Sequence, residues 1–457
     1  MAENKSLTYD RIKKITETDG AKIHFTGVGG VSMYSLASII KKNGAIVSGS
    51  DTAESDRTRK LAELGAEIFI GHSPSLVNGA SLLVHSHAIP NDDPEIEEAK
   101  KLGTPIVSRA EFMGSMMIKY KNKIGVSGSH GKSTTVAMLD SIFTLAGKSP
   151  DVLSGADLPF GEPYKTDGGE TLIYEGCEYK DSFLSFTPSI FIALNLELDH
   201  TDYFKDMSAL RSSFARAMNK AGLVILSGDD PQLTALQRDV RKRIITYGQG
   251  ERSDYRYSIS EFRERGFGFE VFSRGKSIGK FEINIPGVFN VSNATAAIIA
   301  ALESGIDVET AARGISAYRG IKNRMERVGV HLGRAVYYDY AHHPTEISSV
   351  INAVKMETHD EVTVIFKPHT YSRTKSLWED FRSSLSLADY LILTDIYPAR
   401  ETAIRGVSSE RLAREIGGGA MFCEDASVRE AIDRFTHGAI IIMGAGGLEE
   451  IRASVEI

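Results

Sequence analysis

The feature that most limits how this sequence can fold is a repeated unit of apolar strand, glycine-rich turn and helix. The first copy has KIHFT at 22–26, GVGG at 27–30 and a predicted helix over 31–43. The second has KIGVS at 123–127 and then GSHGKSTT at 128–135. Strands that alternate with helices form parallel βαβ units with right-handed crossovers. The chain is therefore predicted to be an α/β protein with doubly wound sheets.

Other segments extend this pattern along the chain. Strands are expected at 45–50 and 82–86, and a third series comprises VYYDY, VTVIF, YLILTD and AIIIMGAG, starting at residues 336, 362, 390 and 439. Residues 252–285 alternate apolar and polar side chains, which predicts a small antiparallel patch. A chain of 457 residues has room for about three domains of ~150 residues. We predict domains at 1–118, 119–325 and 326–457.

The composition excludes several classes of protein. A formal charge of −7 argues against general binding to nucleic acid, which depends on basic surface. Cys177 and Cys423 are the only cysteines, too few for a disulfide framework or a four-thiolate zinc site. No apolar run approaches the ~20 residues that span a bilayer, and no apolar signal region opens the sequence. We therefore expect a cytoplasmic protein that does not bind membranes.

The strongest local signal is the loop at 128–134, which follows an apolar strand and opens a helix. Small residues let backbone N–H groups approach phosphate oxygens, and the helix N-terminus adds partial positive charge. Lys132 is expected to reach the phosphates and Ser133 to bind Mg²⁺. Val126 stands where the usual pattern has glycine, and a glycine-rich turn without a ligand is the alternative. The candidate ATP-binding residues are Gly128, Ser129, His130, Gly131, Lys132, Ser133 and Thr134.

Two further residues downstream of this loop are candidate metal ligands. Glu175 ends the predicted strand at 172–174, and His200 follows the predicted strand at 190–194. Each alone is a weak signal, because a single histidine is more often packed or part of a cap than a ligand. Their shared position at strand ends makes Ser133, Glu175 and His200 the candidate metal site.

The N-terminal turn resembles part of a dinucleotide-binding fingerprint. Gly27, Gly29 and Gly30 follow the first strand, and Asp51 ends the next strand, where an acid often binds ribose hydroxyls. Ser32 occupies the place of the third glycine. The turn therefore supports a pyrophosphate or nucleotide site without identifying NAD, and a tight turn with no ligand is the alternative.

Several ordered segments together resemble the Mur ligase family of peptidoglycan precursor synthesis, in its alanine-adding branch. The resemblance rests on GVGGVSM at 27–33, SGSD at 48–51, GSHGKSTT at 128–135, NLELDHTDYF at 195–204, DYAHHPTEI at 339–347, FKPHTYSRT at 366–374 and DIYPARE at 395–401. These segments cover nearly the whole chain in order, which is far more specific than any one of them.

The resemblance implies a Rossmann-like N-terminal domain for the UDP-sugar, a central P-loop ATPase-type domain and a Rossmann-like C-terminal domain for the amino acid. It implies ATP and Mg²⁺ as cofactors, with one Mg²⁺ on Ser133 and Glu175 and a second on His200. It implies UDP-N-acetylmuramate and L-alanine as substrates, and it leaves a homodimer open. The reaction would proceed through an acyl phosphate. The matched residues are Lys132, Arg324 and His342 for catalysis, Asn290 and Asn293 for the adenine side, and Tyr340, His342 and Arg373 for the amino acid.

The match has departures, and other functions stay open. Phe289, Asn323, Lys367 and Thr370 stand where the family usually has other residues, and Gly446-Gly447 replaces a common Gly-Asp. Lys367 would place a positive charge near a substrate carboxylate. His342 could accept the amine proton, because histidine exchanges protons near neutral pH. Alternatively, His342 and His343 could simply cap a helix that begins near residue 345. The rival functions are a ligase that adds a preformed tripeptide to the same UDP-sugar, a nicotinamide-dependent oxidoreductase, and a nucleotide-binding regulator without activity.

Overall fold

The computed structural model describes residues 7–200, 203–263, 265–399, 401–435, 437–453 and 455. By its contacts the chain divides into two compact units, residues 1–255 with 296–311, and residues 256–295 with 312–457. Within the described residues, no helix combines the length and the apolar character needed to cross a bilayer.

The first unit begins with a five-stranded sheet in the order β3-β2-β1-β4-β5, in which every pair is parallel. The order reverses between β1 and β4, so the loops after these two strands diverge and leave a crevice at their carboxyl ends. The elements are α1 (Tyr9–Thr16), β1 (Lys22–Thr26), α2 (Val31–Lys42), β2 (Ile46–Asp51), α3 (Asp56–Glu63), β3 (Glu67–Ile70), β4 (Leu82–His85), α4 (Pro94–Leu102), β5 (Ile106–Ser108) and α5 (Arg109–Met116).

The strands that follow in the same unit are hydrogen-bonded in the order β12-β11-β10-β6-β9-β7-β8. All the pairs among them are parallel except β7 with β8. The elements are β6 (Asn122–Ser127), α6 (Lys132–Leu145), β7 (Asp151–Leu153), β8 (Tyr164–Lys165), β9 (Thr171–Glu175), the 3₁₀ segment η3 (Tyr179–Ser185), β10 (Ile190–Ala193), α7 (Met207–Met218), β11 (Leu223–Ser227), α8 (Pro231–Leu236) and β12 (Arg243–Gly248). Because β6 is flanked by β9 and β10, the residues that follow these neighbours reach the loop after β6.

The second unit contains the predicted antiparallel patch and a six-stranded sheet. The patch comprises β13 (Tyr255–Arg263), β14 (Gly266–Ser273) and β15 (Lys276–Ile283), and β14 pairs with β15 antiparallel. The sheet has the order β16-β17-β21-β18-β19-β20, with β16 the antiparallel edge strand. The strands are β16 (Glu326–His331), β17 (Arg334–Asp339), β18 (Val362–Phe366), β19 (Tyr390–Leu393), β20 (Ala420–Phe422) and β21 (Ala439–Met443).

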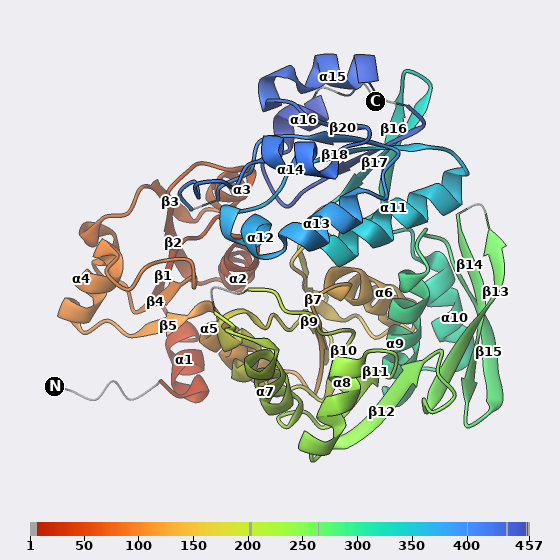
Figure 1. Cartoon of the computed structure of the whole chain (residues 1–457). Helices are drawn as coiled ribbons and strands as arrows, with labels where there is room; N and C mark the ends of the chain where they lie inside the picture. Colours follow the sequence, from red (N-terminus) through yellow and green to blue (C-terminus); the bar gives the residue numbers. More distant parts are fainter. Residues whose placement is uncertain are drawn as a thin grey trace. The chain divides into compact units, whose positions relative to one another are not determined.

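Helices cover both faces of this six-stranded sheet (Figure 1). The core on one face contains Ile347 and Phe381, and the core on the other contains Val428 and Ile451. The first face carries α11 (Pro344–Thr358), α13 (Trp378–Leu385) and α14 (Ser409–Ile416), and the second carries α15 (Val428–Phe435) and α16 (Glu449–Ala453). The short α12 (Tyr371–Ser376) follows β18, and α9 (Phe289–Glu303) and α10 (Val308–Ala317) each have residues in both units.

A buried carboxylate joins α4 to the first sheet. Glu95 is fully buried, and its Oε2 accepts hydrogen bonds from the hydroxyls of Thr26 and Ser50, each at 2.8 Å. The same oxygen lies 3.0 Å from Nε2 of His24. These partners come from β1 and β2, so one side chain links the helix to two neighbouring strands.

Replacing Glu95 with alanine should destabilise the first unit by about 3 kcal/mol, because three buried polar groups lose their acceptor. Glu95→Gln should cost less, since an amide oxygen can still accept. Glu97→Ala on the same helix is the matched control, because the Glu97 side chain is half exposed. Urea unfolding followed by circular dichroism measures all three variants. Equal midpoints for Glu95→Ala and Glu97→Ala would contradict the assigned role.

Candidate functional site

The loop between β6 and α6 has a backbone that only glycine adopts readily. Gly128 has φ +142° and Gly131, the N-cap of α6, has φ +83°. A Cβ on Gly128 would lie 3.1 Å from Cβ of Leu194 and 3.2 Å from the backbone N of Asn195. Glycine at this position therefore lets the loop pass close to the end of β10, and α6 then begins at Lys132.

Residues that follow β10 fix the loop through hydrogen bonds. Oδ1 of Asn195 accepts from the backbone N–H of His130 at 2.8 Å, and Nδ2 of Asn195 donates to the His130 carbonyl at 3.1 Å. The backbone N–H of Glu197 donates to Oγ of Ser129 at 2.8 Å, and that hydroxyl donates to the Glu197 carbonyl at 3.0 Å. The segment that the sequence assigned to metal binding thus also shapes the loop.

The Lys132 ammonium lies at the centre of the loop. Its Nζ donates to the carbonyl oxygens of Gly128 at 2.5 Å and Ser129 at 3.2 Å. It also lies 3.5 Å from Oε2 of Glu178, whose other oxygen is 3.9 Å from Nε2 of His200. The structure therefore brings Lys132 and His200 to opposite oxygens of one carboxylate.

Sequence reasoning missed Glu178. The side chain is 4% exposed, and its Oε2 has no hydrogen-bond partner among the described residues. Glu175, the predicted ligand, accepts from the Ser154 hydroxyl at 3.0 Å and the Gly155 backbone N–H at 2.6 Å. The signal that could have identified Glu178 is its position three residues beyond Glu175, in the same segment after β9.

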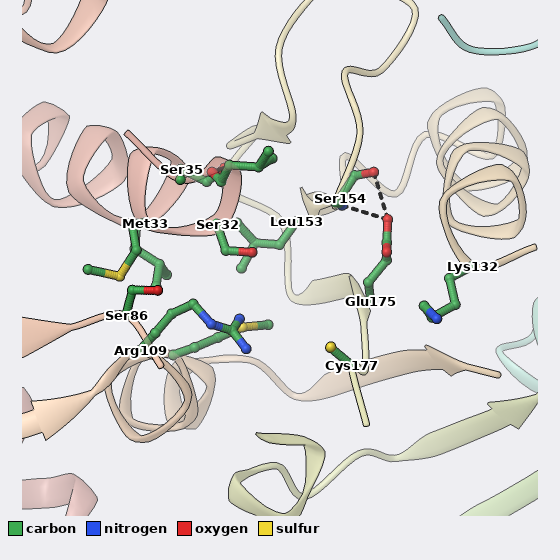
Figure 2. Close-up of a pocket in the computed structure, with 15 residues that line it drawn as sticks. Ser32, Met33, Ser35, Ser86, Arg109, Lys132, Leu153, Ser154, Glu175 and Cys177 are labelled. Atoms are coloured by element: carbon green, nitrogen blue, oxygen red, sulfur yellow. Dashed lines mark hydrogen bonds between the residues drawn. The ribbon is translucent and has the colours of Figure 1, made fainter. Parts of the chain in front are cut away.

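A cavity of about 330 Å³ lies beside Lys132 in the first unit. Figure 2 shows Ser32 at the start of α2, together with Arg109, Glu175 and Cys177, among its lining side chains. Burial lowers the pKa of Arg109, the first residue of α5. A desolvated guanidinium attracts anions strongly. Sequence reasoning also missed Arg109, because it is a single arginine outside any recognised motif.

The predicted N-terminal turn lies at the start of α2. The backbone N–H of Gly29 donates to Oδ2 of Asp51 at 2.8 Å, and that of Thr52 donates to Oδ1 at 2.8 Å. Gly27 has φ +81°, and Gly30 is the N-cap of α2. The structure thus brings Asp51 to the turn, where its carboxylate fixes the backbone. Binding of a ribose by Asp51 stays a prediction.

In the second unit, the predicted adenine-side residues lie at the start of α9. Asn290 and Asn293 are both buried, and Nδ2 of Asn293 donates to Oδ1 of Asn290 at 3.1 Å. Asn290 also donates to the Pro286 carbonyl at 2.7 Å. The structure brings this pair together, and its contact with a nucleotide stays a prediction.

Four predicted residues of the second unit lie together: Arg324 precedes β16, Tyr340 and His342 follow β17, and Arg373 follows β18. The guanidinium of Arg324 lies over the Tyr340 ring, 5.0 Å from its centroid. Nδ1 of His342 is 3.0 Å from the Tyr340 carbonyl, so the proton of a neutral imidazole belongs on Nδ1. The His342 and His369 rings are 6.0 Å apart, and the His369 Nδ1 is 3.0 Å from a terminal guanidinium nitrogen of Arg373.

The Lys367 side chain differs from the sequence expectation: it is buried in an ion pair with Asp425, so its charge already has a partner within the chain. Of the two histidines that could cap the helix, His343 is the N-cap residue of α11 and accepts from the backbone N–H of Thr345. Within the predicted motifs, residues 201, 202 and 400 lie outside the described residues.

Asp339 is a buried acid at the end of β17, directly before Tyr340. Its two oxygens accept from the backbone N–H groups of Met325 at 2.7 Å and Ala341 at 2.6 Å. Burial raises the pKa of Asp339 to about 6, against the opposing effect of Arg324. The acid is therefore harder to ionise in the folded chain than in the unfolded chain.

The protonated form of Asp339 consequently favours folding. A pKa that rises by ~2 on folding contributes at most about 3 kcal/mol to the free energy of unfolding. This contribution is complete below pH ~4 and is lost as the pH rises through 6. We expect the stability of wild type relative to Asp339→Asn to fall between pH 5 and pH 7. Urea unfolding at both pH values measures this difference, and an unchanged difference would show that Asp339 titrates normally.

Comparisons with known proteins show which family this chain resembles. Three family models match the chain: "Mur ligase family, catalytic domain" at 22–121, "Mur ligase middle domain" at 126–301 and "Mur ligase, glutamate ligase domain" at 323–446. A UDP-N-acetylmuramate–L-alanine ligase of Alkaliphilus metalliredigens is 40% identical over 93% of this chain and 94% of its own. One of Caldanaerobacter subterraneus is 39% identical over 94% of this chain and 96% of its own.

Solved structures give the same result for the fold. The UDP-N-acetylmuramate–alanine ligase of Thermotoga maritima matches with a TM-score of 0.79 and 26% identity, over 95% of this chain and 97% of its own. A murein peptide ligase of Psychrobacter arcticus, at 24% identity, matches with a TM-score of 0.72 over 95% and 98% of the two chains. The three-domain α/β fold and the resemblance predicted from the sequence are confirmed: the chain belongs to the Mur ligase family.

Proposed function

We propose that this chain is an ATP-dependent ligase that joins L-alanine to the carboxylate of UDP-N-acetylmuramate through an acyl phosphate, in peptidoglycan precursor synthesis. The observation that carries the proposal is the loop of residues 128–134, in which Lys132 lies between two backbone carbonyls and the buried Glu178. The proposed sites follow the predicted domains, with the UDP-sugar bound by 1–118, ATP by 119–325 and the amino acid by 326–457.

The proposed ligation needs the positive charge of Lys132 and of the N-terminus of α6. A carboxylate and an amine do not condense in neutral water, so the carboxylate must first receive a phosphoryl group and gain a leaving group. Two like unit charges 4 Å apart repel by about 4 kcal/mol at an effective dielectric constant of 20. Lys132 and the N-terminus of α6 offset this repulsion between ATP and the substrate acid, and they stabilise the phosphoryl group during transfer.

The residues near Lys132 also fit Mg²⁺. Hard cations prefer oxygen ligands, and Oε2 of Glu178 is a buried oxygen without a hydrogen-bond partner among the described residues. We propose that Ser133 and Glu175 hold one Mg²⁺ and His200 a second, as predicted, with Glu178 as an additional ligand. Bound there, Mg²⁺ would neutralise charge on the phosphate oxygens of ATP.

Two arginines suit the carboxylates of the substrates. Arg109 lines the cavity beside Lys132 and Glu175, so we assign it to an anionic group of the UDP-sugar. The N-terminal turn at Gly27, Gly29, Gly30 and Asp51 is assigned to the same substrate. In the second unit, Arg373 would bind the α-carboxylate of the amino acid in a bidentate way.

The amino acid must attack as a neutral amine, and His342 is placed to help. With its Nδ1 proton directed to the Tyr340 carbonyl, Nε2 is the atom that accepts the proton from the ammonium. Tyr340 contributes to the same pocket. Arg324, which lies over the Tyr340 ring, is assigned to the charge that develops on the transferred phosphoryl group.

L-Alanine is favoured over a preformed tripeptide as the second substrate. The relatives that are 39–40% identical are named as L-alanine ligases, whereas the murein peptide ligase structure shares 24% of its sequence with this chain. A nicotinamide-dependent reaction is disfavoured because the loop at 128–134 suits a triphosphate. A regulator without activity is disfavoured because Lys132, Glu178 and His200 lie together.

Replacing Lys132 with alanine should lower ligation at least 1,000-fold, since charge on the transferring phosphoryl group loses its main neutralising cation. UDP-N-acetylmuramate should still bind, because its proposed contacts are with Arg109 and the N-terminal turn at Gly27, Gly29, Gly30 and Asp51. Phosphate release measures the reaction, and calorimetry measures substrate binding. Lys148→Ala, an exposed lysine just beyond α6, is the matched control. Wild-type turnover by Lys132→Ala would refute the proposal.

Phosphate release with ATP, Mg²⁺ and UDP-N-acetylmuramate should depend on the added amino acid. L-Alanine should exceed the tripeptide by at least about 100-fold in kcat/KM, since the tripeptide has an amide in place of the free α-carboxylate that is assigned to Arg373. Glycine and L-serine, tested alongside, define how closely the pocket fits that methyl group. Equal or faster reaction with the tripeptide would assign the chain to the recycling reaction instead.

A further inference from the structure

We propose that Tyr179 is a positioning residue that fixes the orientation of the His200 imidazole. The inference rests on the proposed role of His200 as a metal ligand. Tyr179 begins η3, directly after Glu178, and its ring centroid lies 4.7 Å from that of His200 at an interplanar angle of 38°. Both side chains belong to the first unit.

The His200 ring needs such a contact because it has few other constraints. Among the described residues, no hydrogen bond reaches either ring nitrogen, and Nε2 lies 3.9 Å from Oε1 of Glu178. Histidines that bind metals usually have the second ring nitrogen hydrogen-bonded, which fixes how the ring points. Here the Tyr179 ring, which packs against the imidazole, fixes how that imidazole points.

The backbone of His200 also depends on local contacts. Its φ is +54°, in the left-handed region that a residue with a Cβ adopts only when its surroundings favour it. The His200 carbonyl accepts from the backbone N–H of Tyr203 at 2.8 Å, and the Tyr203 ring packs edge-on against Tyr179 with centroids 6.4 Å apart. Tyr179 therefore contacts the His200 segment at two points.

Tyr179 can position another residue only if it is itself fixed, and the two residues after it provide this. Lys180 and Asp181 have φ values of +50° and +58°, consecutive left-handed residues without glycine. Lys180 donates to the His87 carbonyl at 2.8 Å, a loop residue beyond β4. Asp181 accepts from Arg216 at 2.8 Å and Tyr203 at 3.1 Å, and also from the Ser213 hydroxyl on α7.

The segment 178–181 thus links three parts of the first unit. Glu178 reaches Lys132 of the loop, Tyr179 packs on His200, and Lys180 contacts the loop after β4. One short stretch of backbone sets the spacing between the cation, the carboxylate and the imidazole. Loss of the Tyr179 ring should release the imidazole and the edge of the Tyr203 ring, whereas Glu178 keeps its contact with Lys132 and Lys180 keeps its bond to the His87 carbonyl.

Titration with Mn²⁺ in the presence of ATP, followed by electron paramagnetic resonance of the full-length protein, tests this directly. Tyr179→Leu should raise the Mn²⁺ dissociation constant about 10-fold, the smaller effect expected when a residue that orients a metal ligand is lost. It should raise the KM for Mg²⁺ in ligation to a similar extent. Tyr179→Phe keeps the ring, and it should restore both values to within about 2-fold of wild type.

A double-mutant cycle with His200→Gln shows whether Tyr179 acts through His200. In the His200→Gln background, Tyr179→Leu should leave Mn²⁺ binding unchanged. An equal loss in both backgrounds, or no loss in the wild-type background, would overturn the positioning role. If His200→Gln itself leaves Mn²⁺ binding unchanged, the proposed metal role of His200 fails instead, so the two failures are distinguishable. Thermal melting of each variant identifies any general loss of folding, which Tyr179→Phe should not show.

Discussion

The interaction on which the rest of this structure depends is the contact of the Lys132 ammonium with the carbonyls of Gly128 and Ser129. A cation surrounded by fixed backbone dipoles stays in place whether or not its carboxylate partner moves. Glu178 then approaches the same ammonium at 3.5 Å without closing a tighter ion pair. The loop can therefore present positive charge to an anion, because its lysine is positioned mainly by neutral groups.

The position of β6 between β9 and β10 explains why these groups meet. Parallel strands end at one edge of a sheet, so the segments after β9 and β10 converge on the loop after β6. Asn195 shapes the loop from one side, and Glu178 reaches it from the other. Strand order thus brings together four side chains that are up to 68 residues apart in the chain: Lys132, Glu178, Asn195 and His200.

Strand order could not be predicted from the sequence, so the contacts that depend on it were missed. The strands near 22–26, 123–127, 362–366 and 390–393 and the start of α6 were predictable, because apolar runs bounded by glycine are local signals. Glu178, Arg109 and Glu95 were missed, because their roles arise from contacts between distant segments. Glu175 was predicted as a ligand because it ends a strand; its Oε1 accepts from Ser154 and Gly155, and its binding of a metal stays a prediction.

The second unit shows how a strained arrangement can be maintained beside a site. Asn323 and Met325 both have positive φ, which costs of order 1 kcal/mol or more per residue, and they flank Arg324. Asp339 accepts from the backbone N–H of Met325, while the Asn323 carbonyl accepts from Tyr340 at 2.8 Å. These two bonds set Arg324 over the Tyr340 ring. Asp339 is suited to this task because its two oxygens accept from backbone groups in both segments, at Met325 next to Arg324 and at Ala341 next to Tyr340.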